Sequence, residues 1–160
     1  MALIRQQVID ALVARLGAIT LAGGYSREVG AKRVHHARRL PQQLATPAVV
    51  LLQGDEGVSS RVGDRYECSL PISIGFVDAY AGATPDVEAL EFLADVQRAM
   101  QVEISLTVTR YSDAAAVPHV VRMLEVGNSI NAGDPIDGKI YGEAQYEVIY
   151  QRSIHDPAKH

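Results

Sequence analysis

The sequence predicts an α+β domain, with a mostly antiparallel β-sheet and two α-helices packed on one of its faces. Two segments, 1–16 and 84–100, carry apolar residues at helical spacing. Between and after them lie segments that alternate apolar and polar residues or are continuously apolar, as strands do. The order is helix, strands, helix, strands, without the repeated β-α-β units of a parallel sheet.

Composition bounds the class of protein. The 160 residues are 48% hydrophobic and 21% charged, which is ordinary for a globular protein and predicts one domain, 1–160. The net charge of −4 gives no general attraction to nucleic acid or to an anionic membrane. No apolar run approaches the ~20 residues of a membrane span. Arg5, Asp10 and Arg15 leave no uncharged signal-peptide core. We therefore expect a soluble protein made inside the cell.

The first helix is predicted over residues 1–16, because apolar positions recur three or four residues apart. Its apolar face consists of Ile4, Val8, Leu12, Leu16 and Ile19. Residues 26–37 are predicted as a strand, although their alternation is poor. Pro47 then introduces 48–52, a continuously apolar run that is typical of a central strand.

The most informative segment is 64–78, which alternates apolar with small or polar residues over its whole length. Its apolar face consists of Tyr66, Cys68, Leu70, Ile72, Ile74 and Phe76. At about 3.3 Å per residue this strand reaches roughly 50 Å. Pro71 lacks an amide hydrogen and Gly75 weakens pairing, which predicts a sheet edge or a bulge. A long open edge needs a partner, so we expect this strand to pair with another copy of the chain.

The second helix is predicted to begin with Thr84 as its N-cap and Pro85 at its first position. Its predicted buried stripe is Leu90, Leu93, Val96 and Met100, joined by Ala89 and Phe92. Three acids, Glu88, Glu91 and Asp95, are predicted to line the opposite face. They could line a channel in which like charge lets DNA slide, or form an ordinary solvated face. Strands at 102–109, 117–126 and 139–151 complete the sheet.

The sequence holds no motif for catalysis or for a cofactor. It lacks a phosphate-binding glycine loop, a dinucleotide fingerprint and a Gly-x-Ser-x-Gly elbow, and the single cysteine excludes a cysteine-rich zinc site. On a strand, the adjacent His35 and His36 point to opposite faces and cannot share a metal. Glu143 and Glu147 share a strand face, but nothing splits their pKa values as acid–base catalysis requires. We expect no enzyme activity, cofactor or metal; a small enzyme using these glutamates or a histidine is an alternative.

Charged and loop residues supply candidates for contacts with other subunits or partners. Arg33, Arg38 and Arg39 belong to the one basic cluster, interpreted as a solvated edge or subunit contact. A nucleic-acid-binding module is the alternative, although no aromatic residues interleave with the cluster. Two long loops are predicted at 53–63 and 127–138, and the second does not match a calcium-binding pattern. The further contact candidates are Asp55, Glu56, Val58, Arg61, Pro71, Ile130, Asp134 and Ile136.

The element order and several stretches resemble the tail terminator, or tail completion, proteins of long-tailed bacteriophages. The stretches that carry the resemblance are IRQQVIDAL at 4–12, LATPAVVL at 44–51, ISI at 72–74, LEFLADV at 90–96 and YEVIY at 146–150. The likeness spans nearly the whole chain and is one of pattern and length, without a signature motif.

The resemblance implies a small α+β subunit that forms a hexameric ring on the last ring of the tail tube, at the head-proximal end of the virion tail. Such a ring is assembled in the host cytoplasm, stops growth of the tube and presents a surface to the neck, or head–tail connector, proteins. DNA passes through it without specific binding, and no membrane is involved. The family offers no catalytic residues to transfer. Another neck or head–tail joining protein is the alternative that the resemblance leaves open.

Overall fold

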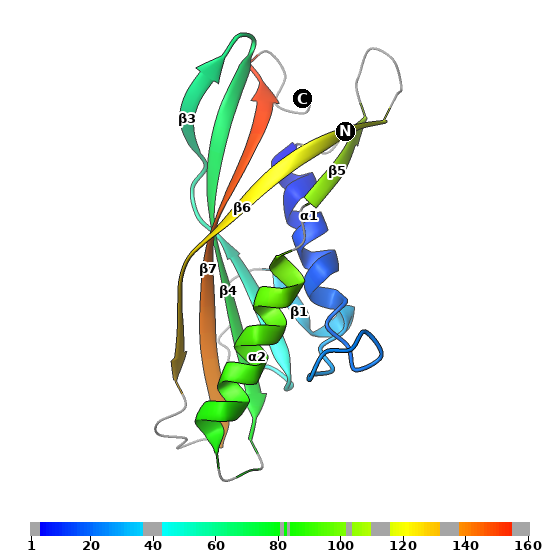
Figure 1. Ribbon diagram of the computed structural model, residues 1–160, viewed down its shortest axis with the longest axis vertical. Coiled ribbons are helices and arrows are strands. Elements are labelled where there is room, and N and C mark those ends of the chain that lie inside the picture. Colours follow the sequence, from blue (N-terminus) through cyan, green and yellow to red (C-terminus); the bar gives the residue numbers. More distant parts are fainter. Residues whose placement is uncertain are drawn as a thin grey trace.

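The computed structural model describes residues 4–36, 43–80, 82, 84–101, 104–109, 116–131 and 138–154. Within these residues, two α-helices, α1 (Ile4–Gly17) and α2 (Pro85–Met100), lie on one face of a seven-stranded sheet (Figure 1). A short 3₁₀ turn, η1 (Ala31–Arg33), precedes the first strand. The predicted α+β fold, with both helices on the same side of the sheet, is therefore confirmed.

The sheet is antiparallel except at one margin. Its described strand order is β1 (Val34–His36), β2 (Ala48–Gln53), β4 (Arg65–Ala79), β7 (Lys139–Ser153), β6 (Ala116–Asn131) and β5 (Ile104–Thr109). The remaining strand, β3 (Gly57–Val62), pairs with β4. Among the described pairs only β1 and β2 run parallel.

The core lies between the helices and the inner face of the sheet. The predicted apolar face of α1 is confirmed, since Ile4, Val8, Leu12 and Leu16 are fully buried. The apolar residues of β4 from Cys68 to Phe76 are buried against the same core, as their period of two predicts. Phe76 meets Phe92 of α2 with ring centroids 4.6 Å apart. Burying each such side chain contributes about 1.5–3 kcal/mol.

Helix α2 begins where the sequence predicts but differs from the prediction in two details. Pro85 occupies its first turn, yet the side chain of the N-cap residue, Thr84, makes no capping hydrogen bond. Leu90 was expected in the buried stripe but is 52% exposed. The rest of the predicted stripe is buried, namely Ala89, Phe92, Leu93, Val96 and Met100.

Strand β4 is an interior strand, so the prediction that it forms a sheet edge is wrong. β7 pairs with it along its whole length, and the other side is shared between β2 and β3. On a strand, the N–H and C=O of one residue point to the same neighbour. The Pro71 carbonyl accepts a hydrogen bond from Gly54 N at 2.8 Å. The Pro71 nitrogen, which carries no hydrogen, therefore faces the connection between β2 and β3. No hydrogen bond between strands is required there.

Three predicted segments have different boundaries in the structure. The predicted loop at 53–63 contains β3, and β6 extends through Asn131 into the predicted loop at 127–138. Among the described residues of the predicted strand at 26–37, only those of β1 form a strand. The earlier part is irregular because Ser26 and Arg27 turn toward acidic side chains at α2 and at the end of β4. The polar sequence of β3 gives no strand pattern and therefore predicts a loop. In the first part of 26–37, tertiary contacts with acidic side chains take the place of strand pairing.

Candidate assembly interface

A three-stranded arm extends beyond the helices at one end of the molecule (Figure 1). It consists of β3, the first part of β4 and the last part of β7. All six residues of β3 are exposed, and Val58 and Val62 are exposed by 52% and 57%. Among the described residues no strand pairs with the outer side of β3. This strand, rather than β4, carries the open backbone edge that association by strand pairing requires.

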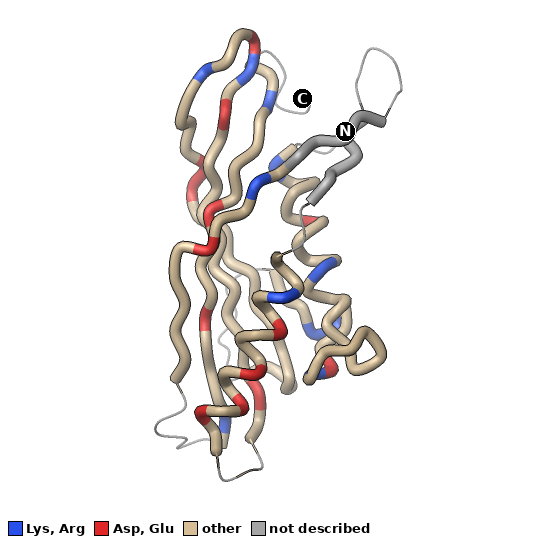
Figure 2. Tube along the Cα trace, viewed as in Figure 1, with Lys and Arg blue, Asp and Glu red and all other residues tan. Residues whose placement is uncertain are grey.

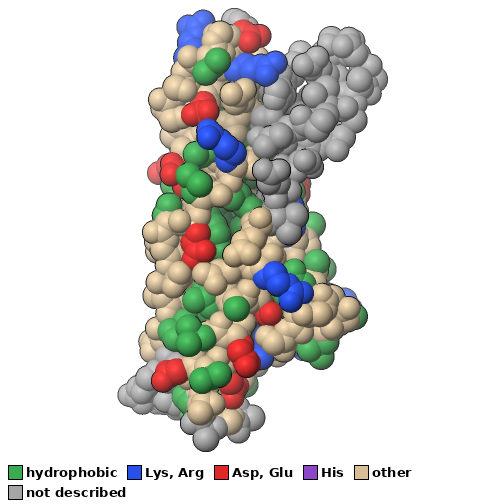
Figure 3. Space-filling view, in the orientation of Figure 1, with side chains coloured by type: hydrophobic (Ala, Val, Ile, Leu, Met, Phe, Trp, Pro, Cys, Tyr) green, Lys and Arg blue, Asp and Glu red, His purple; other side chains and the backbone are tan. Residues whose placement is uncertain are grey.

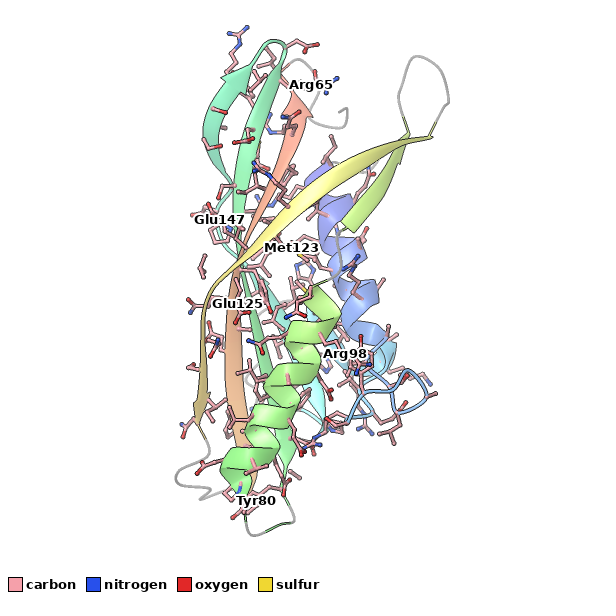
Figure 4. The ribbon with its side chains drawn as sticks, in the orientation of Figure 1. Arg65, Tyr80, Arg98, Met123, Glu125 and Glu147 are labelled. Atoms are coloured by element: carbon pink, nitrogen blue, oxygen red, sulfur yellow. The ribbon has the colours of Figure 1, made fainter. Side chains whose placement is uncertain are left out.

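The arm ends in a tight turn. Val62 pairs with Arg65 across a two-residue loop in which Gly63 has a φ of 62°, a conformation that glycine adopts without a steric penalty. Gly-Asp at this position is a hairpin signal that the sequence contains and that could have revealed β3. Figure 2 marks basic residues along the chain near this end of the arm, and Figure 4 places Arg65 at its tip.

A partly buried polar cluster anchors the base of the arm. Glu56, in the connection from β2 to β3, accepts a hydrogen bond from the Tyr150 hydroxyl and a 3.0 Å ion pair from Arg152 Nε. The Arg152 guanidinium also lies over the ring of Tyr66, 5.4 Å from its centroid. Burial, followed by the bond to Glu56, raises the pKa of Tyr150. Glu56 was a candidate for contact with a partner; here its carboxylate holds the arm to its own protomer.

The sheet face opposite to the helices carries serine–glutamate pairs. Ser73 Oγ donates to Glu143 Oε1 at 2.6 Å, and Gln145 Nε2 donates to the same oxygen at 2.9 Å. These two bonds lower the pKa of Glu143, against a smaller rise from burial. Further along β7, the Ser69 hydroxyl donates to Glu147 in the same way. Figure 4 shows Glu147 near the middle of the molecule.

A hollow of about 210 Å³ lies on this outer face. Its lining includes Val50, Leu52, Ser73, Gly75, Tyr141 and Glu143. Gly75 pairs with Val50 on one side and with Glu143 on the other, so its missing side chain leaves the space between them. The sequence alone does not reveal the hollow, because the hollow depends on which residues of three strands lie in register.

The acids of α2 contact the segment that follows α1 rather than forming a uniform exposed face. Asp95 is only 7% exposed and accepts hydrogen bonds from the amide and the hydroxyl of Ser26, at 2.9 and 2.6 Å. The prediction that Asp95 shares an exposed acidic face is therefore wrong. Glu88 and Glu91 lie 4.0 and 3.6 Å from the Arg27 guanidinium. A channel role for these two glutamates stays a prediction.

Arg27 is the centre of this contact. Its Nε lies 2.7 Å from Asp78 Oδ2 in an ion pair. Burial raises the pKa of Asp78, and Arg27 opposes the rise. Arg98 binds the same segment through the carbonyls of Gly23 and Gly24, at 3.1 and 2.9 Å. Figure 4 shows Arg98 extending from α2 toward that segment.

The other predicted contact residues are dispersed. Arg33 donates to the Thr46 carbonyl at 2.7 Å, which ties η1 to the segment before β2. Ile130 was expected on a projecting loop but lies on β6, half-buried against the core. Asp55, Val58, Arg61 and Pro71 are exposed. Arg38, Arg39, Asp134 and Ile136 lie outside the described residues.

The described residues present little that suggests a reaction centre. Glu143 and Glu147 share a face, but they are four positions apart, which is about 13 Å along the strand, beyond the roughly 5–9.5 Å between the paired carboxylates of glycosidases. The lowered pKa of Glu143 is also opposite to what a general acid needs. Over the described chain no group of three or more His, Cys, Asp or Glu side chains could hold a metal ion. In the same residues, neither helix has the length and apolar character to cross a membrane.

No protein-family model matches this chain, and no curated protein matches it. Among solved structures, it is similar to a chain described as "Virion of native gene transfer agent (GTA) particle", with a TM-score of 0.45 and 12% sequence identity. The alignment covers 94% of this chain and 92% of that chain. This likeness assigns no role to any residue.

Proposed function

We propose that this chain is a non-enzymatic structural subunit of a virion, a tail terminator that forms a ring of six copies. The ring caps the tail tube, stops its polymerisation and presents a surface to the head–tail connector. The observation that carries the proposal is the arm, which projects beyond the helices and ends in a strand with an open outer edge.

The arm supports association because it exposes backbone groups and apolar side chains together. Val58 and Val62 are exposed on β3 with three polar residues between them, and Figure 3 shows apolar side chains among polar ones on the visible side of the arm. An unpaired strand of this kind is a template for another chain. A contact between two different surfaces of one chain repeats from copy to copy, and it closes into a ring when the rotation permits.

The sequence resemblance to tail terminators supplies the identity of the partners, which are the tail tube protein and a neck or connector protein. Electron microscopy of particles assembled without this chain tests the assignment. Overlong tails are expected for a terminator, because nothing then stops the tube. Detached tails of normal length would show a head–tail joining protein instead.

A second measurement tests the ring itself. Light scattering and negative-stain images of the purified chain, alone and with isolated tail tubes, are expected to show closed rings in at least one of these conditions. A well-folded monomer in both conditions at high concentration would contradict the proposal.

A further inference from the structure

The hollow on the outer face of the sheet has the form of a socket for one side chain. Its floor is Gly75, where a Cβ atom would meet nothing nearer than 3.9 Å. Val50 and Leu52 form an aliphatic wall on β2, and Leu52 is 38% exposed. Tyr141 contributes to the opposite wall on β7. Both helices pack on the other face of the sheet, so neither of them covers this space.

The socket also has a charged rim. The Glu143 carboxylate is oriented by Ser73 and Gln145, and both donors bind the same oxygen, Oε1. These bonds lower the pKa of Glu143, because they favour its charged carboxylate form. An aliphatic wall beside a fixed carboxylate matches a side chain with an apolar stem and a cationic head. Arginine fits best, because its guanidinium pairs with a carboxylate through more than one N–H.

The same chain carries an exposed arginine of this kind at the end of the arm. Arg61 lies on β3, two residues before the turn, and its Nε donates to the Gly63 carbonyl at 3.0 Å within the turn. Its register partner on β4 is Tyr66. Gly75 lies nine residues further along β4, about 30 Å away. An arginine side chain cannot span that distance, so Arg61 reaches only the socket of another copy.

We propose that Arg61 of one copy enters the socket at Gly75 of its neighbour and pairs there with Glu143. This inference rests on the proposed ring. The contact joins the arm of one protomer to the sheet face of the next. Donor and acceptor surfaces differ, so the interface is heterologous and repeats in one direction around a ring. Charge complementarity, the aliphatic walls and the length of the arm select a second copy as the occupant.

Charge reversal tests the pairing, once the wild-type chain has been shown to form rings. Glu143→Arg and Arg61→Glu are each expected to raise the dissociation constant of the ring at least about tenfold. The double variant is expected to recover most of that loss, because the pair is restored with opposite polarity. Circular dichroism establishes that each variant is folded.

Two matched variants control for general charge effects. Glu147→Arg changes the same face of β7 outside the socket. Arg65→Glu changes the arm tip on the other face of the hairpin, since Arg61 pairs with Tyr66 and neighbouring residues alternate in direction. Both are expected to leave assembly within about twofold of wild type. Losses equal to those of Glu143→Arg and Arg61→Glu, or a double variant no better than either single one, would overturn the pairing.

Crosslinking provides a measurement that does not depend on charge. Chains with Gly75→Cys and chains with Arg61→Cys are mixed and treated with a short bis-maleimide, which is expected to join one chain of each kind. The native Cys68 is fully buried, so it should not react. If the wild-type chain forms rings but the two cysteine variants give no crosslink, the inference is overturned and the proposed function stands. A wild-type chain that stays monomeric, alone and on tubes, would overturn both.

Discussion

At the scale of single residues, Asp95 shows how one buried carboxylate holds a distant segment in place. It accepts two hydrogen bonds from Ser26 and is nearly inaccessible to solvent. Asp95→Ala leaves the Ser26 amide without its partner, and we expect the free energy of unfolding to fall by about 1–3 kcal/mol. Urea denaturation measures the change.

The control for this substitution is Glu91→Ala, one helical turn earlier. Glu91 is exposed and lies 3.6 Å from Arg27, so its removal is expected to change the free energy of unfolding by less than about 0.5 kcal/mol. Equal losses in the two variants would show that Asp95 is no more important than a surface acid.

Glu143 makes stability depend on pH. Its pKa in the unfolded chain is near 4.5, and the hydrogen bonds from Ser73 and Gln145 lower it in the folded protein. Between these two values the unfolded chain binds more protons, so stability falls as the pH falls. The stabilisation is fully present above about pH 4.5 and is lost as the pH falls through the folded value.

The variant Glu143→Gln removes this titration. Urea unfolding from about pH 7 to about pH 3 is therefore expected to show a smaller acid-induced loss for the variant than for wild type. The stability difference between the two chains should shrink as the pH falls below 4.5. Parallel curves for the two proteins over that range would contradict the role of these hydrogen bonds.

At the scale of elements, two glycines on the paired strands β4 and β7 have opposite tolerances to an added side chain. A Cβ at Gly142 would lie 2.1 Å from the ring of Phe76, its register partner on β4. Gly142→Ala is expected to lower the free energy of unfolding by about 1–3 kcal/mol, because the ring must move within a packed core. Gly75→Ala, on the outer face, is expected to stay within about 0.5 kcal/mol of wild type. Similar effects of the two substitutions, measured by thermal unfolding, would contradict this packing.

What the sequence predicts about the elements depends on how local the cause is. The period of two in β4 assigns residues from Cys68 to Phe76 to the buried face, because alternation follows from the geometry of a single strand. Whether β4 is an edge depends on β3, whose six exposed residues show no apolar alternation. From the sequence, Asp95 is predicted to be an exposed acid, because its hydrogen-bond partner Ser26 lies 69 residues away. The socket depends on register across three strands, which no single stretch encodes.

At the scale of the whole molecule, the arm can act in assembly only if it is held rigidly to the body. β4 and β7 run from the body into the arm and pair along their whole length. Glu56 adds a polar anchor through Tyr150 and Arg152. An arm that moves relative to the sheet would lose conformational entropy on binding a neighbour, and this loss weakens association. Rigidity at the base of the arm is therefore expected to affect ring formation from a distance.

The variant Glu56→Ala tests this coupling against its exposed neighbour, Asp55→Ala. Loss of Glu56 leaves the Tyr150 hydroxyl and Arg152 without their shared partner, so amide hydrogen exchange in β3 should accelerate and ring formation should weaken. Asp55→Ala should leave amide hydrogen exchange in β3 unchanged. If Asp55 contacts a partner, as the sequence predicts, this substitution weakens ring formation without changing that exchange. Faster exchange in Glu56→Ala with undiminished ring formation would show that the arm need not be rigid, because assembly then tolerates the motion that the anchor suppresses.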